Sequence, residues 1–258
     1  MKRRYNGRTF VRERVVVAGN RMEVSVYPVF QPPGVRRGKC HPTKEIQQKI
    51  NERNSINQGV RLAEANFGSN DYALHLTYAK EPDDLKAAQR VLSNFISRLK
   101  RLYARKGKEL KYMKRTETGK SSGRLHHHLF ISGGVDRDDI EALWGQGRAN
   151  TTRIQPDKDE GIEGIARYIA GEGKKKETYR RWSCSRNCIR PEITEKDGEM
   201  DVEAADALGE AAEAGLGYDI FESMYPGWIC VSCEGIRNES NRGWYTHAVL
   251  RRKNVKNC

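Results

Sequence analysis

The chain has 258 residues and a formal net charge of +13, with 47 Lys and Arg residues against 34 Asp and Glu residues. This length can bury a hydrophobic core, and this charge favours a polyanionic partner such as nucleic acid. No apolar run of about 18 residues occurs, and no apolar segment follows the basic N-terminus, so we expect no membrane partner and no secretion. Six cysteines are too few for a disulfide scaffold at this length, which points to a cytoplasmic protein.

The first 70 residues predict a hairpin followed by a helix. Two β-rich runs within residues 14–27 flank Gly19 and Asn20, a pair typical of tight turns. Helical periodicity then extends from about residue 42 to residue 66, with Thr43 as its expected cap. We expect residues 1–70 to form an extension packed on a main domain of residues 71–258.

The next segment predicts a strand, a long helix and a second hairpin. Residues 72–78 alternate as a strand, and Pro82 to Asp84 then open an amphipathic helix. The polar face of this helix is basic and carries Lys86, Arg90, Arg98, Arg101 and Arg105. A strand near residues 110–117, a tight loop at 118–123 and an apolar strand that begins with three histidines follow.

The remaining chain predicts further alternation of helices and strands. We expect a short helix capped by Asp136, a strand at 150–155, a helix at 159–171, a basic loop at 174–198, an exposed acidic helix at 199–216 and a final strand at 243–252. Hairpin and crossover connections alternate in this order. The fold class that this predicts is α+β, with a central, mainly antiparallel sheet flanked by helices.

The triple histidine predicts a metal site. Side chains of a strand alternate between its two faces, so His126 and His128 share one face and His127 lies on the other. If Glu117 pairs with Arg124 across the loop, odd positions of the first strand share a face with even positions of the second, and Glu117 projects toward His126 and His128. One carboxylate and two imidazoles suit a divalent ion such as Mn or Mg.

Other interpretations of these residues remain open. A histidine-rich strand can be ordinary polar surface, and His127 can be a core histidine bonded to its neighbours. A catalytic zinc is a further option, although no fourth nitrogen or sulfur donor lies nearby in the sequence. By the same parity Arg115 falls on the metal face, where it would either reach a phosphate or signal an error in the assumed register.

Tyr168 is the candidate nucleophile. In the expected helix at 159–171 it lies off the buried stripe, on a flank rich in glycine. A phenol beside a metal-bound phosphate can attack phosphorus and form a phosphotyrosine ester. The alternative is that Tyr168 is a half-buried amphipathic aromatic residue.

Together, Glu117, the histidine strand and a later helix with a single tyrosine resemble the HUH endonucleases, specifically the single-tyrosine rolling-circle replication initiators of phages and plasmids. The resemblance extends over residues 40–191 and includes Leu76-Thr77-Tyr78 and the segment 181–191. It implies an HUH fold with a five-stranded sheet, and selective nicking and joining of single-stranded origin DNA. It further implies Tyr168 joined to a 5′ phosphate, a free 3′ hydroxyl, a bacterial host cell, and host helicase and DNA polymerase as partners.

One departure supports a rival function. Such initiators usually carry a lysine three residues after the tyrosine, where this chain has Gly171. The missing lysine motivates a non-catalytic origin- or operator-binding protein on a degenerate HUH scaffold as an alternative. A single-tyrosine transposase or relaxase is another.

Two weaker patterns complete the analysis. Basic and aromatic side chains interleave after Tyr168, as in a groove for single-stranded DNA, although a solvated basic loop would look the same. These expected DNA contacts are Arg115, Lys174, Lys175, Lys176, Arg180, Arg181, Trp182 and Arg186. Structural zinc at Cys184, Cys188, Cys230 and Cys233 is a minor option, because residues 228–233 also read as a strand with two buried thiols.

Overall fold

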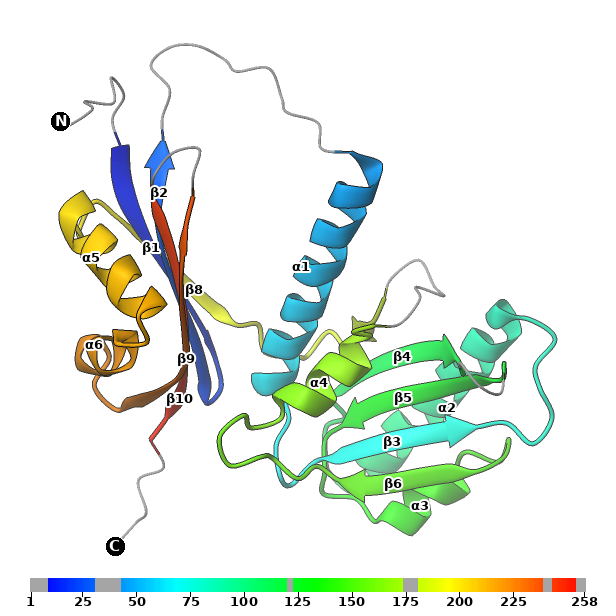
Figure 1. Ribbon diagram of the computed structural model, residues 1–258. Helices are drawn as coiled ribbons and strands as arrows, with labels where there is room; N and C mark the ends of the chain where they lie inside the picture. Colours follow the sequence, from blue (N-terminus) through cyan, green and yellow to red (C-terminus); the bar gives the residue numbers. More distant parts are fainter. Residues whose placement is uncertain (1–8, 31–42, 120–122, 174–180, 239–242, 254–258) are drawn as a thin grey trace, which may run out of the picture. The chain divides into compact units, whose positions relative to one another are not determined.

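The computed structural model describes residues 9–30, 43–119, 123–173, 181–238 and 243–253 (Figure 1). Backbone contacts divide the chain into two compact units. Residues 1–47 and 191–258 form one, here the terminal unit, and residues 48–190 form the other, here the central unit. This division differs from the expected boundary at residue 70, because the last segment of the chain groups with the N-terminal hairpin.

The terminal unit contains a five-stranded antiparallel sheet in the order β8-β1-β2-β10-β9. Its elements are β1 (Thr9–Ala18), β2 (Arg21–Phe30), β8 (Glu192–Asp197), α5 (Val202–Glu213), α6 (Gly217–Met224), β9 (Trp228–Arg237) and β10 (Trp244–Arg252). The predicted N-terminal hairpin and the predicted final strand are confirmed as β1–β2 and β10. The expected basic loop at 174–198 is in part wrong, because β8 and the short strand β7 (Ser183–Cys184) lie within it.

The helix α5 is not fully exposed, as its acidic composition had suggested. Its alanine and leucine side chains pack against the sheet, and Ala205, Leu208 and Ala212 are buried in the core of this unit. A helix of mostly polar residues can still bury one stripe, because positions three and four apart share a face.

The central unit contains a second five-stranded antiparallel sheet, in the order β6-β3-β5-β4-β7. Its strands besides β7 are β3 (Tyr72–Thr77), β4 (Tyr112–Thr118), β5 (Leu125–Ile131) and β6 (Ala149–Arg153). Its helices are α2 (Leu85–Arg105), α3 (Arg137–Ala142), α4 (Glu163–Ala170) and most of α1 (Lys44–Glu64). The α+β class with an antiparallel five-stranded sheet flanked by helices is therefore confirmed, and a second such sheet was not expected.

Helices cover both faces of the central sheet, because its strands alternate in their side chains. Leu129 and Ile131 of β5 pack with α2 and α3, whereas Phe130 packs with α1 and α4 (Figure 1). The helix α2 buries its predicted apolar stripe and begins at the expected place, where Asp84 accepts a hydrogen bond from the backbone amide of Ala87. Among the described residues, no helix combines the length and apolarity needed to span a bilayer.

Candidate metal centre and nucleophile

Strand β5 separates its three histidines as the alternation predicts. His127 lies on the side of α2 and is fully buried. Its Nε2 is 2.7 Å from the Tyr78 hydroxyl and its Nδ1 is 2.9 Å from Oγ1 of Thr116. Burial lowers the pKa of His127 to about 3, so the ring stays neutral with both nitrogens engaged. It is a core histidine and has no free nitrogen for a metal.

Glu117 joins His126 and His128 on the opposite face of the sheet. Its Oε1 is 2.9 Å from Nε2 of His126 and 3.2 Å from Nε2 of His128. The expected pairing of Glu117 with Arg124 is wrong by two residues, since Glu117 pairs with His126. The face was nevertheless predicted correctly, because a slip of two residues in a strand leaves every side chain on its own side.

The charge of Glu117 is fixed by its neighbours. Burial alone would raise the pKa of its carboxyl, but the hydrogen bonds from His126 and His128, together with the nearby charges of His128 and Arg115, hold that pKa well below its usual range. The carboxylate is therefore ionised and accepts the protons of both imidazoles. Metal binding through these Nε2 atoms would have to displace those protons.

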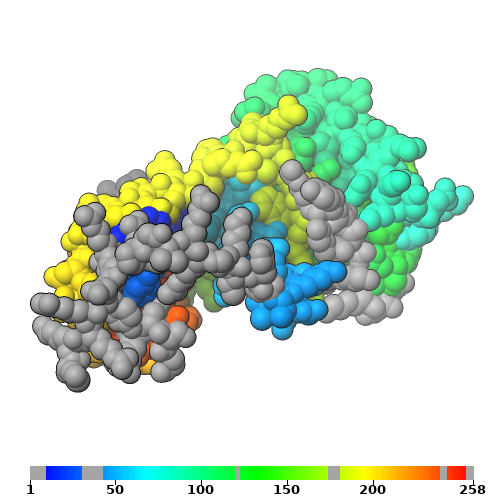
Figure 2. Space-filling model, turned by 90° about the horizontal axis from the view of Figure 1, so that it is seen from above, coloured from blue at the N-terminus to red at the C-terminus, as the bar shows by residue number. Residues whose placement is uncertain are grey.

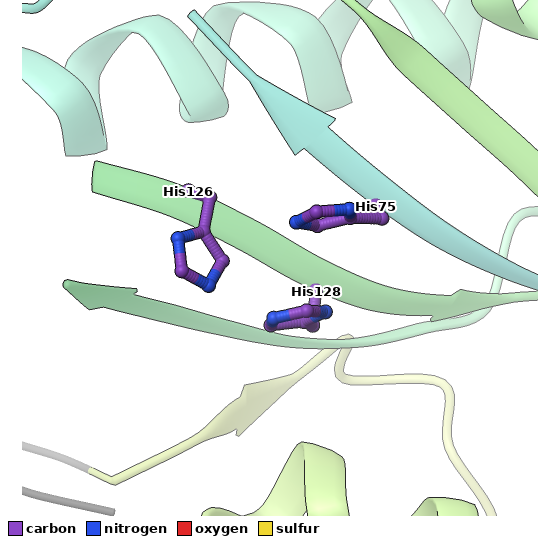
Figure 3. Close-up of side chains that lie close together, drawn as sticks. All are labelled: His75, His126 and His128. Carbon is purple, nitrogen blue, oxygen red and sulfur yellow. The ribbon is translucent and has the colours of Figure 1, made fainter. Parts of the chain in front are cut away.

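His75 is a third imidazole at the site, and sequence reasoning missed it. It comes from β3, which pairs with the other edge of β5 so that His75 lies opposite His128. One ring nitrogen from each of His75, His126 and His128 lies within 4.8 Å of the others, and the three rings turn toward one common space (Figure 3). The only available signal was the alternation of β3, which cannot by itself say which strand lies beside β5.

These residues fit a divalent metal ion. Three imidazoles converge and one ionised carboxylate lies within hydrogen-bond distance of two of them. Uncharged imidazole and carboxylate oxygen are both established ligands for divalent ions. Burial lowers the pKa of His75 to about 4, which keeps its ring in the neutral form that a metal requires.

Arg115 lies beneath this cluster rather than in solvent. Its side chain is 1% exposed, and its Nε donates to Oε2 of Glu117 at 3.2 Å. The same guanidinium lies against Gly171, the last residue of the α4 turn, where a Cβ atom would come within 1.2 Å of Nη1. In this arrangement Arg115 orients Glu117, and the expectation that it binds a DNA phosphate remains a prediction.

The glycine at position 171 has a structural cause. Gly171 has φ 90° and ψ 35°, the left-handed conformation that commonly ends a helix. A side chain there would be strained and would collide with Arg115. The missing lysine is thus the local result of how α4 ends above β4.

Tyr168 meets the histidine cluster. Its hydroxyl is 3.3 Å from Nε2 of His128, and the two rings meet edge to face with centroids 4.9 Å apart. The side chain is 42% exposed, so the phenol is accessible while one edge contacts the site. A hollow of about 340 Å³ opens beside it and is lined by His75, Thr77, Tyr78, Arg124, Leu125, His126 and Tyr168.

The expected DNA contacts after Tyr168 are only partly described. Lys174, Lys175, Lys176 and Arg180 lie outside the described residues. Arg181 donates to the carbonyl of Gly171 and pairs with Glu52, and the indole of Trp182 donates to the carbonyl of Ser55. These two side chains therefore tie the segment to α1 and α4, whereas Arg186 is exposed.

The four cysteines considered for zinc do not form one group of ligands. Cys184 and Cys188 belong to the central unit and Cys230 and Cys233 to the terminal unit, and all four are free thiols. Each unit by itself offers two thiols, which is fewer than the four ligands of a structural zinc site. In the described part of the chain, the only group of three or more metal-binding side chains is the histidine cluster.

Comparison with known families agrees with this site. A family model for the replication-associated protein ORF2 matches residues 71–177, a stretch that begins before β3 and ends after α4. The matched region contains the histidine cluster, Glu117 and Tyr168. Its similarity to replication-associated proteins points to a role in replication initiation and to DNA as a partner. No curated protein and no solved structure matches the chain.

Proposed function

We propose that this protein is a metal-dependent endonuclease that nicks and rejoins single-stranded origin DNA to initiate rolling-circle replication. The observation that carries the proposal is the position of Tyr168, whose hydroxyl lies 3.3 Å from a nitrogen of the histidine cluster. An accessible phenol beside a candidate metal centre is the pairing that transfer of a phosphodiester to tyrosine requires. The similarity of residues 71–177 to replication-associated proteins supports the same reaction.

The reaction balances with the groups present. The phenolic oxygen of Tyr168 forms a bond to the scissile phosphorus, the bond from phosphorus to the 3′ oxygen breaks, the phenol loses a proton, and the 3′ oxygen gains one. The 5′ phosphate stays on Tyr168 as an ester, and attack by a free 3′ hydroxyl reverses the step and rejoins DNA. When bound, a divalent ion supplies Lewis-acid stabilisation of the phosphate charge.

The surrounding residues orient this site. Glu117 holds the rings of His126 and His128 through Oε1, and Arg115 holds Glu117 through Oε2. The hollow beside Tyr168 would receive a nucleotide next to the scissile phosphate. Host helicase and DNA polymerase would act on the free 3′ end in the cytoplasm of a bacterial cell.

The donor set favours Mn over Mg. Magnesium prefers oxygen ligands and retains water, whereas manganese accepts imidazole more readily. The sequence suggested two imidazoles and a carboxylate, and His75 adds a third nitrogen donor. We therefore expect nicking at micromolar Mn and at much higher concentrations of Mg.

The decisive test is a covalent adduct. The full chain is incubated with Mn and a pool of single-stranded hairpin oligonucleotides with randomised loops, and the products are separated under denaturing conditions. We expect a protein-DNA adduct that Tyr168→Phe abolishes and that a chelator prevents. The matched control is Tyr218→Phe, because Tyr218 is a tyrosine of similar exposure at 39%. An adduct that survives in Tyr168→Phe would refute the nucleophile.

The rival proposal, a DNA-binding protein without catalysis, predicts binding of the hairpins with no adduct. Its motive was the glycine in place of a lysine at position 171. Because the backbone conformation of Gly171 and the position of Arg115 account for that glycine, no feature of the described residues favours the rival.

A further inference from the structure

The helix α2 and the turn after it are charged with one sign only. Residues 85–108 contain eight basic residues and no acidic residue. Exposed surface helices usually mix charges, because oppositely charged residues three or four positions apart stabilise the helix. This segment alone supplies a charge of +8 in a chain of net charge +13.

The helical period gathers this charge on one face. Leu92, Phe95 and Leu99 are buried against the sheet, and the opposite face is exposed to solvent (Figure 2). That face carries basic side chains near both ends of the helix, separated by polar residues that can also donate hydrogen bonds. We call it the basic stripe, and it consists of Lys86, Arg90, Ser93, Asn94, Ser97, Lys100, Arg101 and Arg105.

The stripe lacks compensating carboxylates among the described residues. None of its five basic side chains forms an ion pair within the described part of the chain, and Lys100 instead lies 6.0 Å from the centroid of the Tyr112 ring. The nearest acidic groups are already engaged, because Asp84 caps α2 and Asp139 pairs with Lys106. Such repulsion between like charges lowers stability, and a polyanion would relieve it.

We propose that the basic stripe of α2 binds the sugar-phosphate backbone of duplex DNA. From Lys86 to Arg105 the stripe extends about 28 Å at the helical rise of about 1.5 Å per residue. That length matches about eight base pairs of B-form DNA at 3.4 Å per pair. Lysine, arginine, serine and asparagine are also the side chains that contact phosphates in protein–DNA complexes.

Two other polyanions fit less well. Proteins that bind single strands stack bases on aromatic side chains, but both aromatic residues of α2, Phe95 and Tyr103, are fully buried. Helices that lie on membranes insert their apolar face, and the apolar face of α2 is committed to the core of the central unit. Duplex backbone needs neither.

The stripe and the proposed nicking site are separate surfaces of the central unit. α2 packs on the face of the sheet that holds His127, whereas Tyr168 and the histidine cluster lie on the other. The role of the stripe at an origin rests on the proposed function: it would hold the duplex arm while the single strand occupies the nicking site. Binding of duplex DNA by itself does not depend on nicking.

The test measures duplex binding without catalysis. The full chain, with EDTA present, is titrated against a fluorescent 24-base-pair duplex at several salt concentrations. The stripe variant is Arg90→Gln/Arg101→Gln/Arg105→Gln, and the control Lys158→Gln/Lys196→Gln/Arg237→Gln removes the same charge from exposed positions elsewhere. Each lost phosphate contact should reduce the slope of log K against log salt by about 0.9, so we expect a reduction of up to about 2.7 in the stripe variant alone.

Several results would overturn the proposal. An unchanged salt slope in the stripe variant would do so, as would equal losses in the stripe and control variants, because the second result would reflect net charge alone. Binding of phosphatidylserine vesicles in place of duplex DNA would assign the stripe to a membrane. A thermal melt checks folding, and the melting temperature of the stripe variant should not fall, since all three side chains are exposed. Absence of nicking would refute the proposed function and leave this measurement intact.

Discussion

The contact between Gly171 and Arg115 makes a quantitative prediction. Gly171 has φ 90°, and a Cβ atom there would lie 1.2 Å from Nη1 and 2.4 Å from Cζ of Arg115. The substitution Gly171→Ala therefore imposes backbone strain and also displaces the guanidinium. That guanidinium is 1% exposed and pairs with Glu117, so it has little room to move without breaking the pair.

The two costs can be added. An alanine in the left-handed region costs about 1–2 kcal/mol. Breaking a buried ion pair costs about 3–5 kcal/mol, because it leaves uncompensated charge in the interior. We expect Gly171→Ala to lower the free energy of unfolding by about 4–7 kcal/mol if the pair is lost completely.

Urea denaturation of the full chain measures this loss. The matched control is Gly107→Ala, because Gly107 has φ +65° and an added Cβ would meet no atom within 4 Å. It should cost only the strain of about 1–2 kcal/mol. In addition, Arg115→Ala should make Gly171→Ala cheaper, since it removes the obstacle. Equal destabilisation by Gly171→Ala and Gly107→Ala would refute the reasoning.

Three further predictions concern the centre and the helix that carries the basic stripe. Because the pKa of His127 is lowered to about 3, its neutral form stabilises the fold above the unfolded pKa of about 6.5 and this stability is lost as the pH falls below that value; in EDTA, the free energy of unfolding should fall by up to about 1.4 kcal/mol per pH unit from this group, and His127→Asn should flatten that slope between pH 6 and 5. Manganese should raise the melting temperature of the wild type, by an amount equivalent to about 2.7 kcal/mol at 100 times its dissociation constant, and much less in His75→Ala; an equal loss in His247→Ala, a histidine of the terminal unit, would contradict the assigned ligand. Asp84→Ala should cost about 1 kcal/mol in urea denaturation by removing the cap of α2, whereas Asp83→Ala should be neutral, and the reverse order would disprove the cap.

Local patterns in the sequence determined the elements and the faces of the site. Strand alternation placed His126 and His128 together and His127 on the core side, because the side-chain period of a strand is two residues whatever the strand pairs with. Even the error in register left Glu117 on the correct face, for the same reason. Helical periodicity placed Tyr168 off the buried stripe, and the structure leaves it accessible.

Only the tertiary structure decided which of these faces meet. His75 joined the centre because β3 pairs with the free edge of β5, and sequence does not specify the lateral order of strands that are far apart in the chain. The short distance from Tyr168 to His128 depends on how α4 packs across the sheet. In the same way, Gly171 was interpreted from the sequence as a missing lysine, whereas the packing of α4 against Arg115 leaves space for a glycine alone. Long-range packing of this kind is set by the fit of whole elements against one another, which no local pattern of residues contains.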